Sequence, residues 1–364
     1  MAIKNISQIT KLKGKFVLVR LDTNVPLKGK RVLDDSRLRQ AVPTLRFLIK
    51  KGAYPVLVGH LGRPQGRVVP DLSLKPIGYA LGKIIRQPVK VLPLSFGASA
   101  IKKAAKTNLV LLENIRFEPG EDTNQANLSK TLGALADLYV NEAFSVSHRS
   151  SASLVGITKY LPSYAGLSLR HEIDCLEKII KKGGQPLTLL IGGAKIADKL
   201  PVIQRLLPRC QYVLTAGAVA NTFLLAKGLA VGRSLVDEAV LKVAKRILKV
   251  GNKKILLPSD AVVTKWPLKT KQALVKKLAD LKKSDVMVDI GPDTIGSYAA
   301  AIKKSKTIFW SGPLGLTEEP KWSHSTRSLV WLMQERSLAG KTYVLAGGGE
   351  TASFLHQTKL SLNY

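Results

Sequence analysis

Short apolar runs rich in β-branched residues alternate along this chain with longer segments of helical periodicity. This alternation is typical of βαβ units and predicts parallel sheets that helices cover on both faces. In the first half we expect strands at Lys15 to Asp22, Tyr54 to Gly59, Val89 to Leu92, Leu109 to Glu113 and Leu138 to Asn141. In the second half we expect them at Thr188 to Ile191, Tyr212 to Leu214, Lys254 to Leu257, Val286 to Val288, Thr307 to Trp310 and Thr342 to Ala346.

The repeated plan and the length of the chain predict two domains. With 364 residues, the chain is too long for one ordinary core. Leu167 to Lys182 has apolar residues at helical spacing, and Gly183 and Gly184 then favour a helix end. We therefore expect an α/β protein with a first domain at residues 1–166, an interdomain helix at 167–183 and a second domain at 184–364.

The net charge is far from the usual range, because 57 Lys and Arg against 25 Asp and Glu leave +32. Such a charge attracts polyanions, including nucleic acid. The lysines are scattered in pairs such as Lys102-Lys103 and Lys303-Lys304, and no zinc-finger spacing, RNP-like motif or clustered basic arm accompanies them. A solvated basic surface is the favoured interpretation, with nucleic acid bound only through non-specific charge.

Cys175 and Cys210 are the only cysteines, and they lie in no CxxC or metal-binding pattern. They predict a reducing compartment and no disulfide or metal role. The amino-terminal segment lacks the apolar region of a signal peptide, and the longest uncharged stretch, Gln211 to Ala226, is too short to span a bilayer. We expect a cytoplasmic protein that does not associate with membranes.

Polar loops of the first half carry five cationic or imidazole residues, namely Arg37, His60, Arg63, Arg116 and Arg149. Guanidinium groups match phosphate and carboxylate oxygens in a bidentate way, although a surface ion pair is the alternative for each arginine. Ligands of open parallel sheets lie beyond the carboxyl ends of the strands. We therefore expect these loops to hold an anion.

In the second half of the chain, the candidate binding loops are rich in glycine. Gly192 to Lys195 and Gly347 to Glu350 each close an apolar run and open a helical one. Lys195 and Lys199 share one face at the start of a helix expected at Ala194 to Arg205, where unpaired N–H groups favour phosphate. The pattern is not that of a P-loop, so an exposed lysine pair is the alternative. Two sites for phosphorylated ligands predict phosphoryl transfer.

The ordered set of motifs resembles the phosphoglycerate kinase family. Its substrate-domain motifs are similar to LDTNVP, DDSRLRQAVPTL, GHLGRP, LLENIRF and NEAFSVSHRSSAS in this chain. Its nucleotide-domain motifs are similar to GGAKIADK, TAGAVANTFL, VDIGP, SGPLG with a following glutamate, and GGGETAS. The resemblance runs from about residue 5 to residue 357. It implies two doubly wound, Rossmann-like domains with parallel sheets, joined by a connecting helix and a hinge.

The resemblance also implies which residues form the sites. It places 3-phosphoglycerate at Asp22, Asn24, Arg37, His60, Arg63, Arg116 and Arg149. It places ATP or ADP at Gly193, Lys195, Lys199, Gly217, Ala218, Gly291, Pro292, Ser311, Glu318, Gly349, Glu350 and Thr351. The implied catalytic residues are Arg37, which would stabilise the migrating phosphoryl group, and Lys199, Gly348 and Gly349. Glu350 is implied as the ligand of Mg²⁺.

Three residues depart from the family pattern: Glu350 stands where aspartate is usual, Ser311 where asparagine is usual, and Ser151 where a second histidine is common. We expect Glu350 to keep magnesium binding, since the extra methylene preserves the carboxylate. Ser311 removes an amide donor near the nucleotide. Family members continue beyond the last helix, so we expect the sequence ending at Tyr364 to be truncated.

These features predict a monomeric enzyme of glycolysis and gluconeogenesis that transfers a phosphoryl group reversibly between 1,3-bisphosphoglycerate and MgADP, giving 3-phosphoglycerate and MgATP. A Rossmann dehydrogenase is disfavoured, because no GxGxxG with a later acidic partner follows a strand. The alternative is an impaired or truncated family member that binds anions or nucleic acid.

Overall fold

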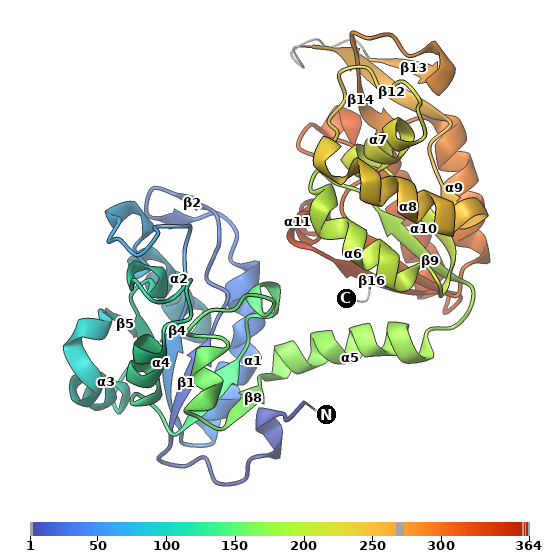
Figure 1. The fold of residues 1–364 in the computed structure, drawn as a ribbon. Coiled ribbons are helices and arrows are strands. Elements are labelled where there is room, and N and C mark those ends of the chain that lie inside the picture. The colour runs from blue at the N-terminus through green and yellow to red at the C-terminus, as the bar shows by residue number, and fades with distance from the viewer. Residues whose placement is uncertain (1–2, 267–272, 359, 361, 363–364) are drawn as a thin grey trace. The chain divides into compact units, whose positions relative to one another are not determined.

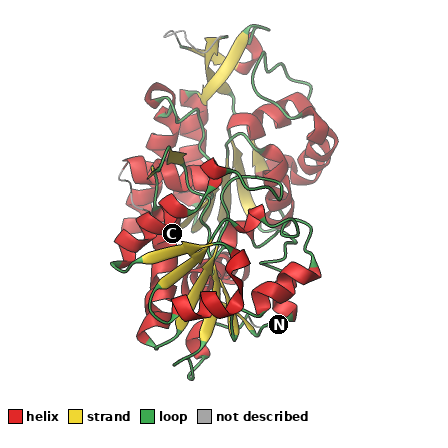
Figure 2. Ribbon diagram, turned by 90° about the vertical axis from the view of Figure 1, so that its left-hand side faces the viewer, coloured by secondary structure: helices red, strands yellow, loops and turns green. Residues whose placement is uncertain are grey.

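The structure is a computed structural model that describes residues 3–266, 273–358, 360 and 362. The chain divides into unit 1, residues 1–174, and unit 2, residues 175–364. Each unit contains a parallel sheet that is flanked by helices (Figures 1 and 2). The predicted α/β class with parallel sheets is therefore confirmed.

Unit 1 is built on six parallel strands in the order β5-β6-β4-β1-β7-β8. They are β1 (Phe16–Arg20), β4 (Tyr54–Val58), β5 (Val89–Leu92), β6 (Leu109–Leu112), β7 (Leu138–Asn141) and β8 (Ser163–Ala165). The first five coincide closely with the predicted ranges. The sequence pattern missed β8, because three residues are too few to show an alternation. It also missed a short hairpin of β2 (Leu27–Lys28) and β3 (Arg31–Val32).

Helices cover both faces of this sheet. Because successive residues of a strand point to opposite faces, neighbouring residues of β1 pack against different helices. Val17 and Val19 of β1 pack in one cluster with α1 (Ser36–Lys50) and α2 (Lys75–Ile85). Leu18 packs in another cluster with α3 (Gly97–Ala105) and α4 (Ala126–Gly133). Burial on both faces explains why the strands read as continuous apolar runs.

Unit 2 repeats the plan with five parallel strands in the order β11-β10-β9-β15-β16. They are β9 (Leu187–Ile191), β10 (Cys210–Thr215), β11 (Ile255–Leu256), β15 (Thr307–Ser311) and β16 (Tyr343–Gly347). One face packs on α6 (Ile196–Leu206), α7 (Gly217–Ala226) and α8 (Leu241–Gly251). The other packs on α9 (Pro292–Lys304), α10 (His324–Leu338) and α11 (Gly349–Thr358).

A third sheet corrects one expectation. The sequence predicts Val286 to Val288 as a strand of the parallel sheet, but these residues belong to β14 (Asp285–Ile290) of a three-stranded antiparallel sheet. Its partner is β12 (Asp260–Lys265), which pairs on its other side with β13 (Leu274–Lys277). Val286 and Val288 pack against Trp322, and the strand is largely buried. A buried strand shows the same apolar run in either kind of sheet.

The helix that links the halves, α5 (Leu167–Lys182), has the predicted bounds and contains the boundary between the units. Gly166, which precedes the helix, has no side chain that could cap the first turn. The cap is supplied by Glu142, which is distant in the sequence. The Glu142 carboxylate accepts the N–H of Leu169 at 2.9 Å and that of Ser168 at 3.2 Å, and it also accepts the Thr44 hydroxyl. Among the described helices, none combines the length and the apolar character that a membrane crossing requires.

Candidate active site

The candidate residues for the acidic substrate lie at one edge of the sheet of unit 1. They follow the carboxyl ends of β1 (Asp22, Asn24), β4 (His60, Arg63), β6 (Arg116) and β7 (Arg149), and Arg37 lies in the first turn of α1. Because β6, β4, β1 and β7 are successive neighbours, the loops after them are adjacent in space. The topology thus gathers residues that are far apart in the sequence.

Asp22 holds Arg37 in place. Its carboxylate accepts a hydrogen bond from Arg37 Nη1 at 2.7 Å and another from the Ser145 hydroxyl. The Arg37 side chain is 35% exposed, whereas that of Asp22 is 10% exposed. Part of the guanidinium therefore stays open to a ligand while one end is fixed.

Gly62 connects two of these loops. Its N–H donates to Asn24 Oδ1 at 3.0 Å, and its carbonyl accepts from Arg116 Nη1 at 2.7 Å. The φ of Gly62 is 62°, which residues with a Cβ rarely adopt. Arg116 Nε also lies 3.2 Å from Asp122. Burial lowers the pKa of Arg116, and the charge of Asp122 opposes this shift.

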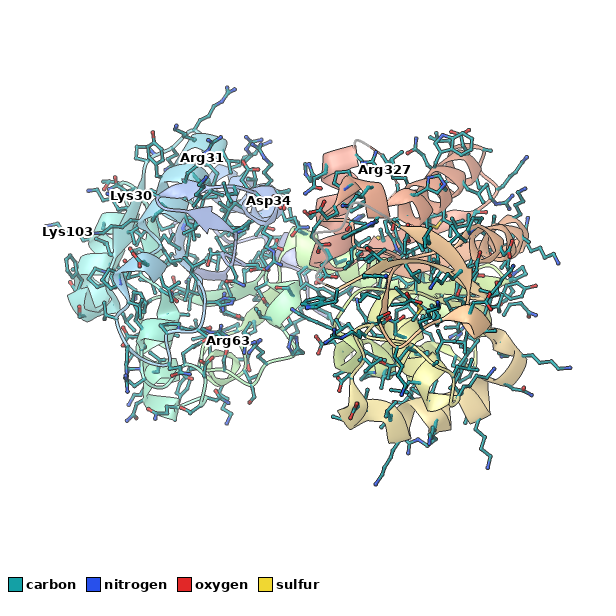
Figure 3. The ribbon with its side chains drawn as sticks, turned by 90° about the horizontal axis from the view of Figure 1, so that it is seen from above. Lys30, Arg31, Asp34, Arg63, Lys103 and Arg327 are labelled. Atoms are coloured by element: carbon teal, nitrogen blue, oxygen red, sulfur yellow. The ribbon has the colours of Figure 1, made fainter. Side chains whose placement is uncertain are left out.

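Three of the arginines share an open pocket of about 640 Å³. Its lining comprises Arg63, Arg116 and Arg149 together with Gln65, Asp122, His148, Ser150 and Ser151. Arg63 is labelled in Figure 3. Among the described residues, Arg149 Nε and Ser151 Oγ are buried and have no hydrogen-bond partner. Buried polar atoms without a partner are rare, and an anionic ligand would supply the missing acceptor for Arg149.

His60 is a neutral imidazole in this setting. Its pKa is lowered from 6.5 to about 2, mainly by burial and then by the charges of Arg20, Arg116, Arg149 and Arg37 in that order. Arg20 Nη2 lies 3.1 Å from His60 Nδ1. Because a guanidinium can only donate, Nδ1 is the acceptor and the ring proton lies on Nε2.

Arg20 is a site residue that the sequence pattern missed. It is 2% exposed, and its Nε donates to Ser153 Oγ at 2.9 Å. Ser153 Oγ donates in turn to Glu121 Oε1 at 2.6 Å. A buried chain of side chains thus runs from Glu121 through Ser153 and Arg20 to His60. The available signal was that Arg20 directly follows the apolar run Phe16 to Val19. A charge at the end of a buried strand is expected to be buried, and buried charges are almost always paired.

In unit 2, a compact group forms at the carboxyl ends of β9, β15 and β16. Lys199 Nζ donates to Ser311 Oγ at 2.6 Å. A methyl group placed on Gly348 would lie 3.6 Å from Ser311 Oγ and 3.9 Å from Lys199 Nζ. Burial lowers the pKa of Lys199, while the charge of Glu350 raises it. The glycine loop, the lysine and the serine therefore surround one small volume.

Glu350 reaches the other glycine loop. A methyl group on Gly193 would lie 2.9 Å from Glu350 Oε2, and Gly193 has a φ of 86°. A methyl group on Gly217 would lie 3.1 Å from Gly193 N. Thr351 is fully buried and accepts the N–H of Gly312 at 2.8 Å. These contacts unite the glycine loops after β9, β10 and β16.

The helix that carries the lysines starts later than predicted. The sequence predicts a helix from Ala194 to Arg205, but α6 spans Ile196–Leu206 with Lys195 as its N-cap residue. Lys195 is exposed, whereas Lys199 is half-buried. The shift of two residues is within the usual uncertainty of helix ends. It places Lys199 beyond the first turn, where its long side chain reaches Ser311.

The remaining nucleotide candidates gather near β14. Gly291 is the N-cap residue and Pro292 the first residue of α9, and the Asp260 carboxylate caps that helix by accepting the N–H of Thr294 at 2.9 Å. The exposed Glu318 follows Leu316, whose N–H donates to Val288 at 2.9 Å. Ala218 is the second residue of α7 and is 5% exposed. In the described part of the chain, none of these four candidates forms a hydrogen bond or ion pair with Lys199, whereas Gly217 lies beside Gly193.

Metal binding fits a single carboxylate better than a protein cage. Within the described residues, no group of three or more His, Cys, Asp or Glu side chains could hold a metal ion. Mg²⁺ bound with a nucleotide takes one or two carboxylates, phosphate oxygens and water. Glu350, beside Gly193, supplies a carboxylate of that kind at the glycine loops.

Comparison with known proteins identifies the fold and the family. The family model described as phosphoglycerate kinase matches residues 6–364. The phosphoglycerate kinase of Thermomicrobium roseum is 38% identical over 357 residues, which cover 96% of this chain and 90% of that protein. That of Caulobacter vibrioides is 37% identical over 359 residues, covering 97% and 91%.

Solved structures agree with the sequence relatives. The structure of phosphoglycerate kinase from Coxiella burnetii has a TM-score of 0.81 at 30% identity and covers 99% of this chain and 91% of its own. The enzyme from Pyrococcus horikoshii has a TM-score of 0.85 at 26% identity and covers 99% and 92%. The chain belongs to the phosphoglycerate kinase family and has the activity of that glycolytic enzyme.

Proposed function

We propose that unit 1 binds 3-phosphoglycerate or 1,3-bisphosphoglycerate and that unit 2 binds ATP or ADP with Mg²⁺. The domain that binds the acid then comprises residues 1–166, and the domain that binds the nucleotide comprises residues 184–364. The helix at 167–183 links them. The observation that carries the proposal is the pairing of an arginine-lined pocket in one unit with a lysine and glycine loops in the other.

The pocket arginines bind and orient the acid. Arg63, Arg116 and Arg149 offer forked donors to its phosphate and carboxylate oxygens. Neutral His60 donates from Nε2 to an oxygen of the same ligand, since its Nδ1 is occupied by Arg20. Asp22 and Asn24 set the loop around them, and Arg37 supplies positive charge to the migrating phosphoryl group.

Transfer between these ligands requires no general base. A carboxylate oxygen of 3-phosphoglycerate attacks the γ-phosphorus of ATP, and the bond from that phosphorus to the β,γ-bridging oxygen breaks. The electron pair of that bond leaves on ADP, and the reverse reaction returns it. Because the carboxylate is already deprotonated, catalysis rests on positioning and charge stabilisation.

The residues of unit 2 stabilise the charge on the nucleotide phosphates. We assign Lys199 and the backbone N–H groups of Gly348 and Gly349 to the transferring phosphoryl group, and Gly193, Lys195 and Thr351 to the other phosphates. Ser311 holds Lys199 in position. The adenosine portion is assigned to Gly217, Ala218, Gly291, Pro292 and Glu318. Glu350 would hold Mg²⁺, which neutralises phosphate charge when bound.

A coupled assay of ATP formation tests these assignments. Arg37→Ala and Lys199→Ala should each lower kcat by about 100-fold or more, as expected for groups that stabilise transition-state charge. The matched controls are Arg39→Ala, an exposed neighbour on α1, and Lys304→Ala, an exposed lysine at the end of α9. If the two test variants keep kcat within the range of the controls, the assigned roles are wrong.

We propose further that the enzyme acts as a monomer in the cytoplasm. Cys175 and Cys210 form no disulfide, which suits a reducing compartment, and Cys210 is buried. Sedimentation at assay concentration would test the monomer, because a dimer would show twice the mass of one chain.

A further inference from the structure

One helix of unit 2 carries a row of positive charge that the catalytic assignment does not use. In α8, Lys242, Lys245, Arg246 and Lys249 stand at positions i, i+3, i+4 and i+7. This spacing places them along one face of a helix. All four side chains belong to exposed residues, whereas Ala244 and Ile247 on the opposite face are buried.

These cations lack acidic neighbours on their own helix. The sequence of α8 is LKVAKRILKVG, and the preceding acids, Asp237 and Glu238, lie before its first residue. Within the described part of the chain, no ion pair is formed by any of the four cations. Like charges at these spacings repel one another. The row is therefore a concentrated positive surface that is not neutralised by its own fold.

The positive surface continues past the end of α8. Lys254 Nζ donates to the carbonyl of Pro208 at 3.2 Å, which joins the end of α8 to the end of α6. The exposed Arg205 and Arg209 lie on either side of this junction in the sequence, and Lys253 is also exposed. Figure 1 shows α6 and α8 on the same side of unit 2. We call the four cations of α8 the α8 basic row.

The chemistry of the row selects among possible partners. A second copy of this chain also carries +32, so charge opposes self-association through this face. Insertion into a bilayer needs a free apolar face, but that of α8 is packed against the core of unit 2. The helix has no aromatic residue on which an unpaired base could stack. The remaining class of partner is a polymer that presents regularly spaced phosphates.

We propose that the α8 basic row binds the sugar-phosphate backbone of double-stranded nucleic acid without reading its sequence. From Lys242 to Lys249 the row is about 10 Å long at the usual helical rise. Duplex DNA presents a phosphate on each strand about every 3.4 Å along its axis, so about three to four phosphates face the row. None of the residues assigned to catalysis lies on α8.

The test compares binding of a short labelled duplex to three forms of the full chain between about 50 and 200 mM salt. The first is the native chain, and the second carries Lys242→Gln, Lys245→Gln, Arg246→Gln and Lys249→Gln. The third is a control with the same loss of charge, Lys90→Gln, Lys103→Gln, Lys106→Gln and Lys130→Gln. These control residues are exposed on unit 1, and Lys103 is labelled in Figure 3.

If the row is the site, its variant should bind at least tenfold more weakly, and the slope of log K against log salt should flatten by about 3. The control should change affinity by less than about threefold. Kinase activity and the melting temperature of both variants should match the native chain, which separates this result from any failure of the catalytic assignment.

Several results would overturn the proposal. Equal losses in both variants would show that bulk charge, and not the row, attracts the duplex. Tighter binding to a single strand than to the duplex would contradict the backbone geometry. Binding to anionic vesicles that exceeds duplex binding, and that the α8 changes abolish, would assign the row to a membrane surface.

Discussion

Arg20 Nη2 lies 3.1 Å from Nδ1 of His60, and both residues are 2% exposed. The arginine therefore fixes which ring nitrogen carries the proton, and under the proposed function it acts on the acid only through the imidazole. It is a positioning residue, held in turn by Ser153 and Glu121.

Replacing Arg20 should release the imidazole. In Arg20→Gln we expect a mixture of His60 tautomers and a rise of about tenfold in KM for 3-phosphoglycerate, since one aligned hydrogen bond to a charged group is lost. The ¹⁵N shifts of the His60 ring report the tautomer directly. Arg46→Gln, at an exposed site on α1, is the control. An unchanged Nε2–H tautomer in Arg20→Gln would remove the basis of the assignment.

His60 should make the protein sensitive to acid. Its pKa is about 2 in the fold against 6.5 unfolded, so the unfolded chain binds a proton that the native protein excludes. Above pH 6.5 this proton does not affect the free energy of unfolding. Below pH 6.5 the free energy of unfolding falls by about 1.4 kcal/mol per pH unit. Urea unfolding at about pH 7.5 and 5.5 should show that His60→Gln loses about 1 kcal/mol less than the native protein on acidification. Parallel losses in both proteins would contradict this.

Glu172 should have the opposite effect. Burial, and then the charges of Glu142 and Asp22, raise its pKa from 4.5 to about 7. A carboxyl group whose pKa is higher in the fold than in the unfolded chain stabilises the fold below pH 4.5, and that contribution is lost as the pH rises through about 7. Glu172→Gln should therefore gain stability relative to the native protein at alkaline pH and not at acid pH. Melting curves at both pH values measure this, and Glu177→Gln on the same helix is the comparison.

The contact between Lys199 and Ser311 predicts non-additive kinetics. Ser311→Ala should lower kcat by about three- to tenfold, because Lys199 loses the acceptor that orients it. In the Lys199→Ala background the same change should have little effect, since there is no ammonium left to orient. A double-mutant cycle in the coupled assay measures this. Independent, multiplicative losses would show that Ser311 acts on the nucleotide by itself.

Magnesium dependence should follow the charge at position 350. Glu350→Gln should raise the Mg²⁺ concentration for half-maximal activity by about tenfold or more, because a carboxylate ligand is lost while the shape is retained. Glu350→Asp keeps the charge and should cost less. The same order should appear when Mg²⁺ binding to the ADP complex is measured by calorimetry. Equal Mg²⁺ dependence of the three proteins would refute the assignment.

Much of the fold could be predicted because buried parallel strands leave continuous apolar runs. The strand at Leu138 to Asn141 and the helix at Leu167 to Lys182 have the predicted bounds. The antiparallel sheet could not be recognised, because β14 is buried as deeply as a parallel strand and β13, at the other edge of the sheet, is exposed. Pairing is a property of distant segments, and local periodicity does not report it.

For the site, the sequence indicated residues in loops but not the residues behind them. Arg63 and Lys199 stand in motifs rich in glycine, which draw attention. Arg20, Ser153 and Glu121 lie in unremarkable surroundings and acquire their role only when β1 and the loops after β6 and β7 meet. A hydrogen-bonded chain of side chains is visible only in three dimensions.

The uncharged state of His60 has a physiological consequence. The neutral ring of His60 therefore adds no formal charge to the loops that carry Arg63, Arg116 and Arg149. A fall in cellular pH to about 6 would leave His60 neutral, whereas the second ionisation of the ligand's phosphate, near pH 6, would respond. The hydrogen bond that we propose from His60 to the acid is therefore insensitive to mild acidification of the cell.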